Sequence, residues 1–123
     1  MLDKGMSKID WRVRKTADIK NLVRGLNPIM GAYSFLEGKK IKFWKVQKLE
    51  KEDFENKVQN FENKKFENAE IGEVLFANEK IGLFIKTIDG IISVLEIQGE
   101  NAKRMNIGDF LRGNKIQIGQ KFE

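Results

Sequence analysis

Apolar residues in the first quarter of the chain recur at helical spacing. Four of them lie three or four positions apart, the period of one face of an α-helix: Ile19, Leu22, Val23 and Leu26. The pattern predicts an amphipathic helix over 17–26, with Thr16 as its N-cap and Asp18 in the first turn, where a carboxylate favours the helix dipole. Asn27-Pro28 ends the helix, because the residue before a proline avoids the helical region.

From residue 31 onward, short runs of strand-forming residues alternate with turn-forming ones. These runs predict five strands: 32–36, 40–46, 73–77, 82–87 and 91–97. Asp89-Gly90 separates the last two and is a strong hairpin signal. In the second strand Trp44 interrupts the alternation, which predicts a β-bulge that lets Phe43 and Val46 both face inward.

The segment 48–70 is acidic, rich in Asn and repetitive. Phe54, Val58 and Phe61 fall at helical spacing, which is compatible with a marginal helix. The favoured interpretation is a flexible acidic insertion over 50–70, with transient helix. Its acids lack the glycine and the alternating ligands of a calcium loop, so no metal site is predicted there.

The end of the chain predicts one more short helix. Asn106 is a suitable N-cap for a helix over 107–112, and Gly113 is expected at the C′ position that follows it. Ile116 and Ile118 then alternate in a brief final segment.

Together these elements predict a mostly β domain of one helix, five strands, a short helix and a tail. Five short antiparallel strands in about 100 residues fit a small closed barrel, because closure removes exposed strand edges. An OB-fold-like five-stranded barrel preceded by one short helix is the expected architecture. An SH3-like barrel is the alternative, and the number of strands alone does not separate the two.

Composition excludes most catalytic chemistry for this chain. Its 123 residues include no histidine and no cysteine, which removes disulfides, thiolate nucleophiles, structural zinc sites and the commonest general base. No apolar run approaches the roughly 20 residues that span a bilayer, and the polar N-terminus lacks a secretory signal core. We therefore expect a cytoplasmic, non-catalytic binding domain without cofactor or metal.

The net charge of +5 is unevenly distributed along the chain. Residues 1–48 hold twelve basic and four acidic side chains, a net charge of +8, whereas 49–79 carry −5 and 80–123 carry +2. A basic excess attracts phosphate groups, which is one interpretation of this charge and would suit a nucleic-acid partner. General solubility is the other interpretation of the same charge.

Three groups of basic side chains are candidate phosphate contacts. The first surrounds the first predicted hairpin: Lys39, Lys40, Lys42 and Lys45. The second lies at the end of the N-terminal stretch that also holds Lys4 and Lys8: Arg12, Arg14 and Lys15. The third lies near the C-terminus: Arg104, Arg112 and Lys115. In the first group, Lys40 and Lys42 share a strand face, and the bulge is expected to bring Lys45 back to it.

Two kinds of role are open for the aromatic residues of these strands. Trp44 and Tyr33 have the chemistry to stack on unpaired bases, as aromatic side chains do in many single-strand binding domains. The favoured expectation is structural: Trp44 packs under a helix, and Trp11 pins the lead-in to the barrel.

A set of short segments follows one order along nearly the whole chain: Ile9-Asp10-Trp11, 22–28, Gly31-Ala32-Tyr33, 38–45, 72–75, Gly82-Leu83, 109–113 and Ile118-Gly119. In residues and in order, these segments resemble the C-terminal domain of methionyl-tRNA formyltransferases. One departure is Ile29-Met30, where the family commonly has Trp-Pro.

The resemblance implies a division of the chain and a role. Residues 1–15 would be a lead-in like the family's interdomain linker, and 16–123 an OB-like C-terminal domain. In the family, a preceding Rossmann-like domain binds 10-formyltetrahydrofolate and performs catalysis, so no catalytic residue carries over to this chain. The C-terminal domain of the family offers a basic surface to initiator methionyl-tRNA. The ten members of the three basic groups are therefore candidate tRNA contacts.

The resemblance also implies two partners, tRNA and a formyltransferase catalytic domain in cis or in trans. An alternative keeps the fold but not the RNA. Related formyltransferases that act on other substrates carry a similar C-terminal barrel for domain packing, so the chain would then be a structural or interaction barrel.

Overall fold

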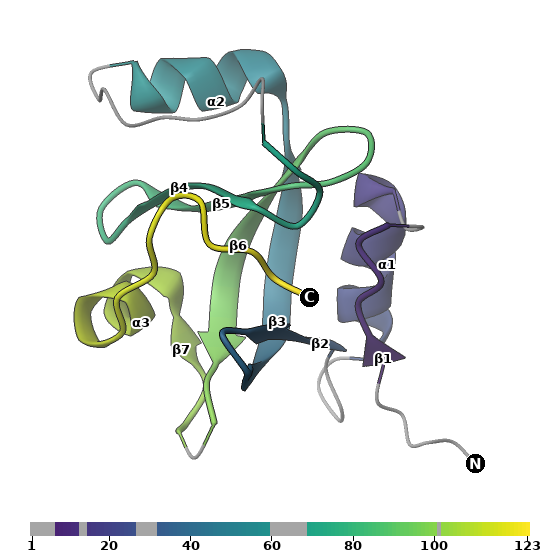
Figure 1. Ribbon diagram of the computed structural model, residues 1–123, viewed down its shortest axis with the longest axis vertical. Coiled ribbons are helices and arrows are strands. Elements are labelled where there is room, and N and C mark those ends of the chain that lie inside the picture. The colour runs from purple at the N-terminus through teal and green to yellow at the C-terminus, as the bar shows by residue number, and fades with distance from the viewer. Residues whose placement is uncertain (1–6, 13–14, 27–31, 60–68, 101) are drawn as a thin grey trace.

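The computed structural model describes residues 7–12, 15–26, 32–59, 69–100 and 102–123 (Figure 1). Within them, the helices are α1 (Thr16–Leu26), α2 (Lys51–Val58) and α3 (Ile107–Gly113). The strands are β1 (Ser7–Lys8), β2 (Ala32–Leu36), β3 (Lys39–Leu49), β4 (Val74–Asn78), β5 (Gly82–Lys86), β6 (Ile91–Gln98) and β7 (Met105–Asn106). The mostly β class and all five predicted strands are confirmed.

The strands form one sheet in the order β1-β2-β3-β6-β5-β4, with β7 beside β6. Neighbouring strands are antiparallel except for β1, which runs parallel to β2. The long strand β3 lies between β2 and β6, and its pairing with β6 shifts register on both sides of Lys45. Phe43 and Val46 are both buried in the main core, so the predicted bulge is confirmed.

The predicted closed barrel is not confirmed, because the described strands form an open path that ends at β1 and β4. The last residues of the chain lie in this opening, where their backbone forms hydrogen bonds with β4 on one side and β2 on the other. The backbone N–H of Val74 donates to the Gln120 carbonyl at 2.7 Å, and Phe35 exchanges two backbone bonds with Glu123 at 2.8 and 3.0 Å. This C-terminal segment forms isolated bridges there, in place of a further strand.

Phe122 brings the C-terminal segment into the main core. Its ring is 1% exposed and lies 5.3 Å from that of Phe43 and 6.1 Å from that of Trp11, between centroids. The indole N–H of Trp11 donates to Ser34 Oγ at 2.9 Å. Trp11 therefore pins the lead-in to the sheet, as the sequence predicts.

Helix α1 confirms the first predicted helix, but its cap is different from the predicted one. The backbone N–H of Thr16 and its hydroxyl both donate to Asp89 Oδ1 at 2.8 Å. The Thr16 hydroxyl is thus bound to the β5–β6 turn. The Ile19 N–H donates to the Lys15 carbonyl at 3.0 Å, so the helical hydrogen bonds begin one residue before the predicted cap. The apolar stripe behaves as expected, since Ile19 and Val23 are buried in the main core.

Helix α2 confirms the helical spacing seen in the acidic segment. Phe54 and Val58 are buried in a second core cluster under β4 and β5, and the Phe54 ring meets Phe84 edge-on at 5.8 Å between centroids. The first part of this segment is therefore a helix packed on the sheet, and the flexibility of 50–70 stays a prediction. Phe61 and the rest of 60–68 lie outside the described residues.

Helix α3 is capped as predicted, with Asn106 Oδ1 accepting from the Asp109 backbone N–H at 2.9 Å. Gly113 is the last helical residue instead of the C′ residue, and the N–H of Asn114 donates to the Phe110 carbonyl at 2.8 Å. Ile116 is buried in the core without forming a strand. Across the described residues, no helix has the length and apolarity to cross a bilayer.

Candidate nucleic-acid interface

Four strands align a row of side chains on the outer side of the sheet. Lys8 of β1 pairs with Tyr33 of β2, Tyr33 with Lys42 of β3, and Lys42 with Gln98 of β6. Phe35 and Lys40 form the next row. Because side chains alternate along a strand, Ala32, Ser34 and Leu36 fill the interior while Tyr33 and Phe35 stay partly exposed. With two neighbours, these residues form what we call the basic-aromatic face: Lys8, Tyr33, Phe35, Lys40, Lys42, Trp44, Gln98 and Arg104.

Cations lie over each of the three aromatic rings of this face. Lys40 Nζ is 4.4 Å from the centroid of the Tyr33 ring, and Lys8 Nζ is 5.9 Å from that of Phe35. At the other end, Lys42 Nζ and Arg104 Cζ are 6.0 and 4.9 Å from the Trp44 ring. Each such pair contributes about 0.5–1 kcal/mol at an exposed site, so the rings hold the cations over the sheet.

Trp44 is held more firmly than the other two rings. It is 7% exposed, and its indole N–H donates to Gln98 Oε1 at 2.9 Å. The Gln98 side chain in turn donates to the Ala102 carbonyl at 2.7 Å, and Arg104 Nε donates to Glu96 Oε1 at 2.8 Å. These contacts hold the segment after β6 over Trp44. The expected packing of Trp44 under a helix stays a prediction.

The first basic group lies where the strand pattern places it. Lys40 and Lys42 share the basic-aromatic face, and Lys45 is exposed at the bulge opposite Glu96. Lys39 is exposed at the start of β3, beside the two-residue turn of the β2–β3 hairpin. Two acids temper the positive charge: Glu96 pairs with Arg104 at 2.6 Å, and Glu100 accepts from the Lys40 backbone N–H at 3.0 Å.

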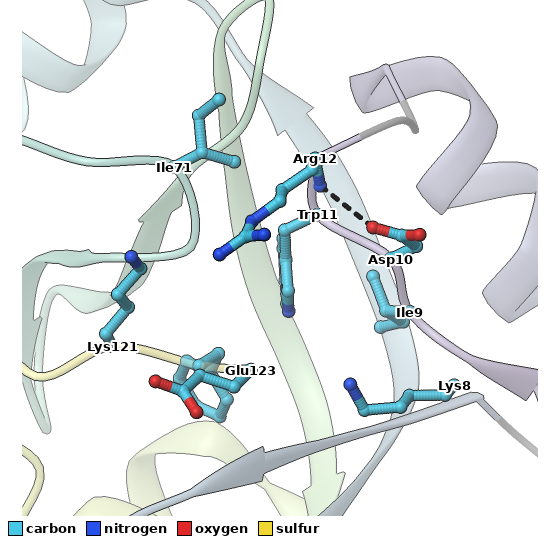
Figure 2. Close-up of a pocket in the computed structure, with 9 residues that line it drawn as sticks. Lys8, Ile9, Asp10, Trp11, Arg12, Ile71, Lys121 and Glu123 are labelled. Atoms are coloured by element: carbon cyan, nitrogen blue, oxygen red, sulfur yellow. Dashed lines mark hydrogen bonds between the residues drawn. The ribbon is translucent and has the colours of Figure 1, made fainter.

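Of the second group, Arg12 lines a groove of about 490 Å³ between the lead-in and the C-terminal segment. Figure 2 shows the Arg12 side chain reaching across Trp11 toward Lys121, with the Lys8 amine on the far side of the groove. Lys15 is exposed just before α1, and Arg14 lies outside the described residues. Lys121 is a groove residue that the sequence pattern did not indicate, since it has no basic neighbour in the chain.

The third group does not stay together. Arg104 joins the basic-aromatic face, whereas Arg112 of α3 binds Glu79 at 3.2 Å and Asp109 at 2.9 Å. Hydrogen bonds raise the pKa of the Arg112 guanidinium above its ordinary value. The bond to Glu79 contributes most, and the bond to Asp109 contributes next. Lys115 is exposed after α3. Arg112 is therefore occupied by acids of its own chain and offers little to a phosphate.

No triad of acidic side chains that could hold a metal ion occurs among the residues that the structure describes. The basic-aromatic face presents cations and aromatic rings, which bind by charge and by contact. The groove presents cations and a ring as well, together with the acidic residues Asp10 and Glu123.

Comparison with known proteins identifies the family. The model described as "Formyl transferase, C-terminal domain" matches residues 1–115. The chain belongs to this formyl transferase C-terminal domain family. The resemblance drawn from the sequence segments is thereby confirmed.

Curated relatives of this formyl transferase domain carry the name methionyl-tRNA formyltransferase. The one from Ruminiclostridium cellulolyticum is 34% identical over 121 residues, which are 98% of this chain and 34% of the relative. That from Carboxydothermus hydrogenoformans is 38% identical over 105 residues, 85% of this chain and 29% of the relative. The chain thus spans about a third of the length of the curated relatives it matches.

A solved structure shares the fold of the formyl transferase domain. HypX from Aquifex aeolicus, in complex with tetrahydrofolic acid, superposes with a TM-score of 0.59 at 19% identity. The match covers 94% of this chain and 20% of HypX. At this identity the likeness concerns the fold alone.

Proposed function

We propose that this chain is a non-catalytic, tRNA-binding C-terminal domain of a methionyl-tRNA formyltransferase. It would hold initiator methionyl-tRNA by its basic surface in the cytoplasm, during translation initiation. A catalytic domain, in cis or in trans, would formylate the methionyl amine with 10-formyltetrahydrofolate. The observation that carries the proposal is the gathering of cations on the basic-aromatic face.

The charge and spacing of this face suit a nucleic-acid backbone. Lys40 and Lys42 are two residues apart on one strand face, and Lys45 is exposed beyond them. Two residues along a strand span about 6.6 Å, close to the separation of successive phosphates in an extended chain. Phosphate contacts give affinity without base specificity, which is what a domain that positions tRNA for another domain requires.

Filter binding of the full chain to initiator tRNA at two salt concentrations tests the proposal. We expect a Kd of about 10⁻⁴–10⁻⁶ M near physiological salt, rising steeply as salt increases. The triple variant Lys40→Ala, Lys42→Ala and Lys45→Ala should weaken binding. It should also reduce the magnitude of the slope of log K against log salt by about 2–3, because each lost phosphate contact lowers that magnitude by roughly 0.7–0.9.

A matched triple variant controls for net charge. Lys48→Ala, Lys51→Ala and Lys57→Ala remove the same charge from exposed positions at the opposite end of β3 and on α2. This control should retain most of the affinity and the salt slope. Equal losses in the two triple variants would overturn the assignment of the face.

The packing-barrel alternative is favoured by the groove in Figure 2, whose mixed lining of Ile71, Trp11 and charged side chains would suit a neighbouring domain. The packing-barrel hypothesis predicts no tRNA binding by the chain at either salt concentration. The same measurement therefore decides between the two functions.

A further inference from the structure

Tyr33 and Phe35 differ from the other described aromatic residues in their exposure. Both are partly exposed on one sheet face, and their rings meet edge-on at 5.6 Å between centroids. The other described aromatic residues are all buried: Trp11, Phe43, Trp44, Phe54, Phe76, Phe84, Phe110 and Phe122. Two adjacent, partly exposed rings beside lysines leave apolar area available for contact with a partner.

We propose that Tyr33 and Phe35 form a stacking platform for unpaired RNA bases, with Lys8, Lys40 and Lys42 binding the phosphates beside them. The inference rests on the proposed function and names the part of the RNA that this face takes. Charge complementarity selects a nucleic acid as the occupant, because the rings are bordered by cations on both sides. Rings set among phosphate-binding cations are the usual arrangement of single-strand platforms.

Lys40 presently lies over the Tyr33 ring, so an incoming base has to displace its ammonium. An exposed cation–π contact changes an equilibrium by roughly two- to fivefold, whereas a stacked base changes it by about 5- to 150-fold. The base therefore prevails. The flexible Lys40 side chain then reaches a neighbouring phosphate. Its ammonium thus contacts the Tyr33 ring in the free chain and a phosphate in the complex.

Trp44 is not part of this platform, although it lies on the same face. Its ring is 7% exposed under Arg104, whose guanidinium is also fixed to Glu96 at 2.6 Å. A base would have to break that ion pair and the hydrogen bond from Trp44 to Gln98 before reaching the ring. The platform is therefore confined to the part of the basic-aromatic face that lies on β2 and its neighbours β1 and β3.

The surface beyond Phe35 continues as a groove. Phe35 lines a cavity of about 480 Å³ that lies next to the groove of Figure 2, and the two share Lys8, Lys121 and Glu123. Each volume is within the range of ordinary ligand sites. A strand that leaves the platform past Phe35 would follow Lys8 toward Arg12, because the Lys121 amine between them is already paired with Glu70 at 2.7 Å.

The test compares two RNA probes on the full chain: a hexamer of adenosine and a hexamer with the same phosphates but abasic ribose. We expect the adenosine probe to bind about 5- to 150-fold more tightly, with a similar salt slope, because stacking does not release counterions. The double variant Tyr33→Leu and Phe35→Leu should lose this difference. The double variant Lys40→Ala and Lys42→Ala should weaken both probes and flatten the salt slope.

A second readout needs no substitution. Tyr33 is the only tyrosine in the chain, so a ¹³C-labelled tyrosine ring gives one set of NMR signals. These signals should shift upfield with the adenosine hexamer and stay in place with the abasic one. Equal affinity for the two probes, or unchanged ring signals while the adenosine probe binds, would overturn the platform and leave the proposed function standing. Failure to bind tRNA and both probes would overturn the proposed function itself.

Discussion

Asp89 fixes the first turn of α1 from a hairpin that lies 73 residues further along the chain. Hydrogen bonds from the Thr16 backbone N–H and hydroxyl, and a longer one from Thr87, stabilise its ionised form and hold the pKa of the Asp89 carboxyl below its ordinary value. One carboxylate therefore joins α1 to the β5–β6 turn and satisfies a donor that the helix itself cannot satisfy.

We predict that Asp89→Asn lowers the free energy of unfolding by about 0.5–2 kcal/mol at pH 7, as the loss of a helix cap does. Because the pKa is lowered by folding, the charged form stabilises the fold above the unfolded pKa of about 3.9. This contribution is lost as the pH falls from there through the folded pKa. The difference between wild type and variant should thus narrow below about pH 4.

Urea unfolding at pH 7, 5 and 3 measures this difference. Asp53→Asn, which removes an exposed acid from the first turn of α2, is the control and should change stability by less than about 0.5 kcal/mol. Equal stability of wild type and Asp89→Asn at pH 7 would show that Asp89 does not hold the helix.

At the residue scale, sequence reasoning succeeds where both partners are local. Asn106 caps the helix that begins at the next residue by binding the Asp109 N–H three positions on, and the bulge at Trp44 follows from alternation within one strand. It fails for the Asp89 cap, because nothing in the local sequence relates a turn residue to Thr16. Lys121 was missed for the same reason, since the groove forms only when the two ends of the chain meet.

At the element scale, α2 lies in a segment predicted to be flexible, yet the helix packs on the sheet through Phe54. Phe54 is 1% exposed against Phe84 and its neighbours. We predict that Phe54→Ala lowers the free energy of unfolding by about 3–5 kcal/mol, because it removes a buried ring and leaves a cavity. A flexible insertion predicts a nearly neutral effect for the same change.

Urea denaturation followed by tryptophan fluorescence distinguishes the two outcomes. Glu55→Ala, the exposed neighbour on the same helix, is the matched control and should cost less than about 0.5 kcal/mol. A loss below about 1 kcal/mol for Phe54→Ala would mean that α2 does not stabilise the sheet.

The same contrast explains which elements were predictable. The five main strands follow from alternation and turn residues, which are local properties. Whether the sheet closes depends on contacts such as Leu36 with Phe122 and Glu73 with Lys121, which join distant parts of the chain. The candidate site divides similarly: Lys40 and Lys42 share a face through strand period alone, whereas Arg104 and Arg112 separate because they meet different partners in space.

At the scale of the whole molecule, β3 separates a basic region from an acidic one. It runs from the β2–β3 hairpin, beside the basic-aromatic face, to the end where α2 follows (Figure 1). Its 11 residues span about 33 Å at roughly 3.3 Å each. Exposed acids on α2 are Glu52, Asp53 and Glu55. Whether they compete with RNA for the basic-aromatic face is decided by distance and screening.

We predict that the triple variant Glu52→Gln, Asp53→Asn and Glu55→Gln changes tRNA affinity by less than about twofold at 0.15 M salt. The Debye length there is about 8 Å, far shorter than the distance along β3, but it reaches about 30 Å at 0.01 M. Affinity should therefore rise in the triple variant only at low salt. Filter binding at both salt concentrations measures the effect.

A single nearby acid is the fitting comparison. The Glu100 carboxylate lies 3.0 Å from the Lys40 backbone nitrogen, within the Debye length at either salt concentration. Glu100→Gln should raise tRNA affinity at 0.15 M more than the triple variant does, although it changes the net charge by one instead of three. If the triple variant had the larger effect at 0.15 M, net charge rather than the local face would govern binding, because only a long-range field counts distant and nearby charges alike.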